Sequence, residues 1–237
     1  MLHELYLLDA ACRAAYAKHD FCQVTRRVLE FVTTTLSSVY LDAVKDTLYA
    51  GYGARRDAVV SVVDAILGTT TSIIAPVLPH LAEDIHWYRG GAERDPKDPS
   101  EVTSFFRTGW KRVDERWYSE SVAQTAAELL ALRAEVYALV ARCREDGCVH
   151  ANRLVRNEAQ VEVELRGSYA HAADLEALCG VARVYVASPS EPDAPWVRAG
   201  ERVRVRPARA DKCPRCWRHT REAADELCDR CAHVVAM

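Results

Sequence analysis

Four of the nine cysteines in this chain occur as two closely spaced pairs near its end, and this spacing restricts the fold more than any other feature. The pairs are separated by eleven residues. Each Cys-x-x-Cys pair can direct two sulfurs at one metal ion, and two pairs complete a tetrahedral site with no position left for water. The alternative is a redox pair or a coincidence of two pairs. The spacing predicts one structural zinc ion bound by Cys213, Cys216, Cys228 and Cys231.

The segment that contains these cysteines, residues 210–237, is too short to build an apolar core of its own. Metal binding should therefore supply much of its folding free energy. His219 and His233 lie close enough in the sequence to replace a ligand, but four sulfurs already saturate the site. We expect a four-cysteine zinc-binding unit that a chelator would unfold.

The rest of the chain has first the periodicity of helices and then that of strands. From Asp20 to Leu48, apolar residues recur three to five positions apart, which predicts one long amphipathic helix. Runs of the same kind predict helices over 59–73, 81–87 and 122–143. Alternation of apolar and charged residues predicts half-buried strands over 161–165 and 202–206, with 183–186 as a third candidate. The predicted fold class is mainly α, with a helical bundle over 1–118, a helix and small mixed α/β subdomain over 119–209, and the zinc unit over 210–237.

Composition and charge exclude several classes of protein. The net charge of -3 and the pI of about 6.3 argue against a polybasic binder of nucleic acid. Residues Ala65–Ala82 have no charged side chain, but eight of them are Gly, Thr, Ser, Pro or His, which argues against a membrane span. The first residues have no signal or targeting pattern. We expect an intracellular protein, monomeric and without a membrane partner.

A basic stretch lies beside the cysteines. Between Arg198 and Arg218 there are eight basic and two acidic residues, a local balance of +6. Such asymmetry favours a phosphate-bearing partner, and an exposed indole at Trp217 could stack on a base. The residues predicted to contact nucleic acid are Arg202, Arg204, Arg206, Arg209, Lys212, Arg215, Trp217 and Arg218.

Two structural alternatives apply to the same residues. Glu162 and Glu164 could form ion pairs with the arginines of a neighbouring strand. Trp217 could simply cover the metal site. Both alternatives remain open at the level of the sequence.

Three segments together resemble one family of enzymes. They are Leu36–Tyr49 (LSSVYLDAVKDTLY), Ala75–Asp84 (APVLPHLAED) and the Cys-Pro-Arg-Cys-Trp and Cys-Asp-Arg-Cys motifs. The first two are similar to the helical anticodon-binding domain of class I aminoacyl-tRNA synthetases for isoleucine, valine, leucine and methionine. The terminal cysteines point to the isoleucine enzymes, and the resemblance covers nearly the whole chain.

The resemblance implies a helical bundle that grips the anticodon arm of tRNA(Ile), a small linker domain, and a zinc unit that helps to hold that arm. The family's activity is the ATP-dependent attachment of isoleucine to tRNA. Its adenylate chemistry uses a His-x-Gly-His motif and a Lys-Met-Ser-Lys-Ser loop, and neither occurs here, since methionine is found only at Met1 and Met237. We therefore expect this chain alone to be inactive as a ligase.

Two interpretations of the whole chain follow. It is the tRNA-binding C-terminal part of an isoleucine-tRNA ligase, with a separate catalytic portion as a second partner, or it is a stand-alone zinc-containing module that binds RNA or protein. An oxidoreductase that uses its Cys-x-x-Cys pairs is the weakest interpretation.

Overall fold

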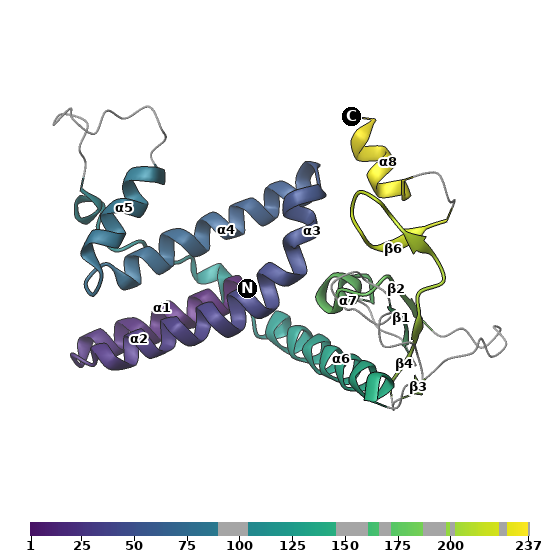
Figure 1. The fold of residues 1–237 in the computed structure, drawn as a ribbon. Coiled ribbons are helices and arrows are strands. Elements are labelled where there is room, and N and C mark those ends of the chain that lie inside the picture. The colour runs from purple at the N-terminus through teal and green to yellow at the C-terminus, as the bar shows by residue number, and fades with distance from the viewer. Residues whose placement is uncertain are drawn as a thin grey trace. The chain divides into compact units, whose positions relative to one another are not determined.

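The computed structural model describes residues 1–89, 104–145, 161–165, 172–186, 198–199, 202–222 and 227–236. Contacts within the chain divide it into two compact units (Figure 1). Unit 1 comprises Met1–Ser38 and Asp57–Glu120, and unit 2 comprises Val39–Arg56 and Ser121–Met237. The three-part division with limits at 118 and 209 stays a prediction.

Unit 1 is made of helices. The chain enters α2 at Asp20, whose side chain accepts a hydrogen bond from the backbone N–H of Gln23 at 2.9 Å. Helical backbone then continues through η1 and into α3 (Asp42–Ala50) of unit 2, so the long helix predicted from Asp20 is present. The elements of unit 1 are α1 (Leu2–Ala17), α2 (Phe21–Glu30), the π-helical η1 (Phe31–Leu41), α4 (Gly53–Ile74), α5 (Pro79–Arg89) and the short 3-10 turns η2 (Phe105–Arg107) and η3 (Glu115–Trp117).

A buried carboxylate holds distant parts of unit 1 together. Asp9 of α1 is only 2% exposed. It accepts hydrogen bonds from Trp110 Nε1 at 2.9 Å and from Arg13 Nε at 2.7 Å. The charge of Asp9 is tolerated at this depth because both of its carboxylate oxygens accept hydrogen bonds.

A second contact joins α1 to the end of α4. The Tyr16 hydroxyl donates to the carbonyl oxygen of Ile73 at 2.7 Å.

Helix α4 is apolar. Among the described residues it is the one helix long and apolar enough to cross a membrane, with a mean hydropathy of 1.5 over 18 residues, 39% of them buried. The core helix of a soluble protein meets the same criteria, so the observation is weak evidence for a span. Ser72 on α4 donates to the Gly68 carbonyl at 3.0 Å and accepts from the Lys111 N–H at 3.3 Å. Part of α4 is thus packed inside unit 1.

Unit 2 contains a four-stranded sheet in the order β2-β1-β4-β3. β1 is parallel to β2 and antiparallel to β4, and β3 is antiparallel to β4. Helix α7 connects the two parallel strands, as such a crossover requires. Both strands predicted from alternation are present, as is the third candidate. The bounds are α6 (Glu120–Glu145), β1 (Val161–Leu165), α7 (Ala172–Cys179), β2 (Arg183–Val186), β3 (Arg198–Ala199) and β4 (Val203–Pro207).

Apolar side chains of α6, α7, β1 and β4 form the core of unit 2. The members include Leu132 and Val136 of α6, Leu175 of α7, and Val163 and Val205, which are register partners on β1 and β4. Each of these side chains is at most 1% exposed. Helix α3 contacts α7 and so belongs to this unit.

The last part of unit 2 has three short elements. β5 (Asp211–Lys212) and β6 (His219–Arg221) pair as an antiparallel ribbon, and α8 (Asp229–Val235) follows. The first cysteine pair lies between β5 and β6, and the second lies at the start of α8. The fold is therefore mainly α with a small sheet region and a C-terminal cluster of four cysteines, in agreement with the predicted fold class.

We predict that Asp9→Ala destabilises unit 1 by about 2 to 3 kcal/mol, because the indole N–H of Trp110 and the Arg13 guanidinium lose their buried acceptor. Urea unfolding followed by tryptophan fluorescence measures the loss. Glu30→Ala is the control, since Glu30 is exposed on α2 and should change stability by less than about 0.5 kcal/mol. Equal stability of the two variants would contradict the role given to Asp9.

Candidate metal centre and the arginines beside it

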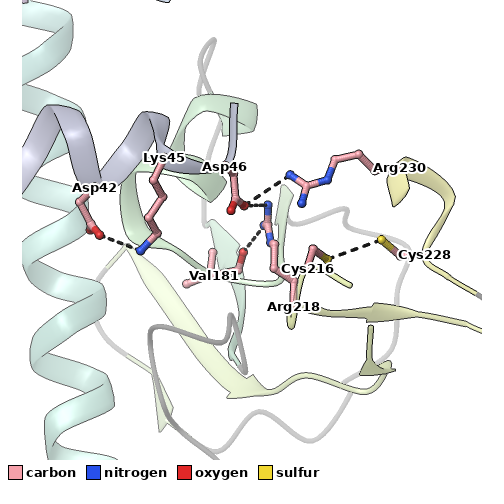
Figure 2. Close-up of polar contacts among 8 residues, drawn as sticks. All are labelled: Asp42, Lys45, Asp46, Val181, Cys216, Arg218, Cys228 and Arg230. Carbon is pink, nitrogen blue, oxygen red and sulfur yellow. Dashed lines mark hydrogen bonds and ion pairs between the residues drawn. The ribbon is translucent and has the colours of Figure 1, made fainter. Parts of the chain in front are cut away.

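The four cysteine sulfurs at the C-terminal end of the chain lie within 4.8 Å of one another. The sulfurs of Cys216 and Cys228, which come from different pairs, are 3.7 Å apart (Figure 2). A tetrahedral zinc site with Zn–S bonds of about 2.3 Å requires sulfurs about 3.8 Å apart. A disulfide would require about 2.05 Å. The donor atoms therefore fit one tetrahedral metal ion, and the group could hold such an ion.

Two tight turns bring the sulfurs together. In the first, the N–H of Trp217 donates to the carbonyl of Cys213, and the N–H of Cys213 donates to the carbonyl of Arg218, both at 2.9 Å. In the second, Cys228 is the N-cap of α8 and its carbonyl accepts from the N–H of Ala232 at 2.9 Å. Each turn thus directs both of its sulfurs to one side.

The first turn imposes a costly backbone conformation on Trp217. Its φ is +62°, in the left-handed region that bulky side chains rarely adopt. The indole is 62% exposed, so burial of the ring does not compensate for this cost. The geometry of the cysteine turn is what fixes the backbone of Trp217.

Burial and backbone N–H groups act in opposite directions on the cysteine pKa values. Burial raises the pKa of Cys213, but hydrogen bonds from the N–H groups of Cys216, Cys228 and Arg215 lower it to about 6. Burial raises the pKa of Cys216 to about 12. Cysteine ligands must lose their protons to bind a metal, and at Cys213 the backbone N–H groups outweigh burial in favour of the thiolate.

Arginines near the cysteines bind a carboxylate on α3. Arg218 NH1 lies 3.1 Å from Asp46 Oδ2, and Arg230 NH1 lies 3.4 Å from the same oxygen (Figure 2). Arg218 NH2 also donates to the carbonyl of Val181 at 2.7 Å. Arg218, one of the residues predicted to bind nucleic acid, therefore forms its contacts with residues of unit 2.

The arginines of β4 and its N-terminal end have carboxylate partners. Arg206 Nε lies 2.6 Å from Glu162 Oε2, and both side chains are buried. These two residues are register partners on β4 and β1. The cross-strand pairing that the sequence left open is therefore the arrangement seen here, and a nucleic-acid role for these arginines stays a prediction. The other two pairs are Arg204–Glu164 at 3.5 Å and Arg202–Glu135 at 3.1 Å.

The remaining predicted residues have exposed side chains near the β5–β6 ribbon. They are Arg209, Lys212, Arg215 and Trp217. Lys212 Nζ lies 5.3 Å from the centre of the Trp217 ring, within the range of a cation–π contact. Arg215 NH1 donates to the sulfur of Cys231 at 3.6 Å. These four residues form the surface that we call the ribbon surface.

Sequence reasoning missed Asp46 and Arg230. Asp46 lies inside the Leu36–Tyr49 segment that resembles tRNA synthetases, and Arg230 lies between two cysteines. The one sequence signal for each residue was its position within a motif. The ion pair between them could not be predicted from the sequence, because Arg230 is 184 positions from Asp46.

Comparison with known proteins identifies the family to which this chain belongs. Residues 1–162 match the family described as the anticodon-binding domain of tRNA ligase. This match covers more than half of the chain, which therefore belongs to the anticodon-binding domain family of tRNA ligases.

The relatives narrow the similarity to isoleucine-tRNA ligases. The chain is 27% identical to the mitochondrial isoleucine-tRNA ligase of Mus musculus, over 99% of this chain and 25% of that protein. It is 30% identical to the isoleucine-tRNA ligase of Thermosynechococcus vestitus, over 98% of this chain and 26% of that protein. It is 29% identical to the isoleucine-tRNA ligase of Geobacillus kaustophilus, over 99% of this chain and 26% of that protein. The chain spans about a quarter of the length of these curated relatives.

We predict that Glu162→Gln destabilises unit 2 by about 3 kcal/mol, because the buried guanidinium of Arg206 loses its counter-charge. Hydrogen exchange of the β1 and β4 amides measures the effect. Glu128→Gln, at an exposed position of α6, removes the same charge and should change stability by less than about 0.5 kcal/mol. Unchanged exchange in Glu162→Gln would show that the pair does not hold the sheet together.

Proposed function

We propose that this chain binds the anticodon arm of tRNA(Ile) as the C-terminal part of an isoleucine-tRNA ligase. The match of residues 1–162 to the anticodon-binding domain family is the observation that carries this proposal. The relatives are named isoleucine-tRNA ligases and align with at least 98% of this chain, which supports isoleucine as the amino acid. Because ligation needs motifs that this sequence lacks, a catalytic portion that has them is the proposed second partner.

We propose that the metal is a single zinc ion with a structural role. The ligands would be Cys213, Cys216, Cys228 and Cys231, whose sulfurs have the spacing of a tetrahedral site. Four thiolates in this geometry favour zinc over metals that prefer oxygen or imidazole ligands. Because all four positions would be filled by protein, the ion would stabilise the fold and activate no water.

The ribbon surface is the proposed contact with the anticodon arm. Arg209, Lys212 and Arg215 would bind backbone phosphates, and Trp217 would stack on an unpaired base. The exposure of these side chains supports the assignment. Arg202, Arg204 and Arg206 would affect tRNA binding indirectly, because their guanidinium groups already form ion pairs with carboxylates on β1 and α6.

Relatives of the chain include a mitochondrial and several bacterial isoleucine-tRNA ligases. We therefore propose an intracellular protein, with the mitochondrial matrix and the bacterial cytoplasm as the two candidate compartments. The rival proposal is a zinc-containing interaction module that binds another RNA or a protein. Selectivity for the anticodon separates the two.

We predict that the zinc-loaded chain binds tRNA(Ile) at least about tenfold more tightly than the same tRNA with a changed anticodon, since a wrong base in a protein–nucleic acid site costs about 1 to 3 kcal/mol. Fluorescence anisotropy at one fixed, near-physiological salt concentration measures both affinities. Equal binding of the two RNAs would leave only phosphate contacts and favour the interaction module. Absence of binding would contradict the proposal for the chain by itself.

We predict that Arg209→Ala lowers the slope of log affinity for this tRNA against log salt by about 0.7 to 0.9, the value for one lost phosphate contact. Only the backbone N–H of Arg209, which alanine retains, donates to Glu162, so the sheet should be undisturbed. Lys18→Ala removes an exposed positive charge at the end of α1 and should leave the slope unchanged. An unchanged slope in Arg209→Ala would remove this residue from the interface.

A further inference from the structure

One carboxylate on α3 receives an arginine from each of the two cysteine pairs. Arg218 follows the first pair by two positions, and Arg230 lies inside the second pair. Both guanidinium groups point to the same oxygen of Asp46, at 3.1 and 3.4 Å (Figure 2). The position of each arginine is therefore set by the cysteine pair to which it is joined in the chain.

This arrangement exists only when the two pairs are together. Cys216 and Cys228 have their sulfurs 3.7 Å apart, and this closeness is what a shared metal ion would enforce. If the pairs separated, Arg218 and Arg230 would also separate, and Asp46 could no longer bind both. Occupation of the metal site and a double ion pair at Asp46 thus require the same arrangement of the chain.

The two ion pairs at Asp46 are partly buried. Arg218, Arg230 and Asp46 have side chains that are 19%, 35% and 37% exposed, so all three are partly withdrawn from water. A cavity of about 310 Å³ adjoins them, so apolar packing does not fill the space between α3 and the cysteines. The rings of Tyr52 and His233, 5.1 Å apart, add one aromatic contact. Polar contacts therefore carry much of this attachment.

We propose that Asp46 is a positioning residue that couples metal binding by the four cysteines to their attachment on α3. Metal loading brings Arg218 and Arg230 into register for Asp46, and Asp46 in turn stabilises the metal-loaded arrangement. Such coupling is reciprocal, because each event shifts the equilibrium of the other by the same factor. The inference depends on the proposed metal site and does not depend on tRNA binding.

The test is the Zn²⁺ affinity of the full chain, measured by competition with a chromophoric chelator. Asp46→Asn keeps the size of the side chain and removes its charge, and we expect about fivefold weaker Zn²⁺ binding. Asp42→Asn is the matched control, because it removes a carboxylate of the same helix whose partners are Lys45 and Arg133, outside the cysteine cluster. It should change the affinity by less than about twofold.

A second readout separates positioning from a general loss of stability. In the Zn²⁺-saturated chain, Asp46→Asn should speed hydrogen exchange in β6 and α8 and leave α4 unchanged, whereas Asp46→Glu should restore much of the protection. In a background of Arg218→Gln and Arg230→Gln, Asp46→Asn should have no further effect on Zn²⁺ affinity. These arginine substitutions also test the contact if the Asp46 variant fails to fold.

The outcomes are distinct. If the unaltered chain binds no Zn²⁺, the proposed metal site is wrong. If it binds Zn²⁺ and Asp46→Asn binds it equally well, the metal site stands and the coupling through Asp46 is overturned. Loss of protection in α4 together with β6 and α8 would also overturn it, since Asp46 would then be a general structural residue.

Discussion

The convergence of four cysteine sulfurs is the constraint on which the C-terminal part of unit 2 depends. The elements around it are short, with two residues in β5, three in β6 and seven in α8. Elements of this length bury too little apolar surface to offset the entropy of ordering the chain. In the described part of this region, the buried cluster consists of cysteines, with Leu227 packed against it. Under the proposed function, a metal ion takes the place that an apolar core has beside α6 and α7.

Carboxylates from distant parts of the sequence determine which basic residues are available to a partner. Glu162 forms an ion pair with Arg206, and Asp46 is shared by Arg218 and Arg230. The local balance of +6 near the cysteines therefore overstates the charge offered to a phosphate, because the compensating acids lie elsewhere in the chain. The residues of the ribbon surface are exposed. The charge that a basic stretch offers to a partner thus depends on the acids that the fold places beside it.

The sequence predicted those features that depend on local spacing. The long helix from Asp20 and the strands β1 and β4 follow from periodicity, and the cysteine cluster follows from two Cys-x-x-Cys pairs. Strand β3, which has only two residues, was not predicted. Helix α1 was predicted only as part of the helical bundle over 1–118, and the burial of its Asp9 could not be predicted, because it depends on Trp110 far along the chain. Asp46 was missed for the same reason, since its partners are 172 and 184 positions away. Contacts between distant residues leave no periodic signal.

The turn at Trp217 links the metal site to the ribbon surface. A φ of +62° is unfavourable for a residue of this size, so the turn that directs the Cys216 sulfur to the cluster must also hold the indole in its exposed position. The next residue, Arg218, joins that turn to Asp46. The backbone of Trp217 is therefore held by the cysteine cluster on one side and by the contact of Arg218 with α3 on the other. Under the proposed function, the position from which the indole reaches a base would depend on both contacts.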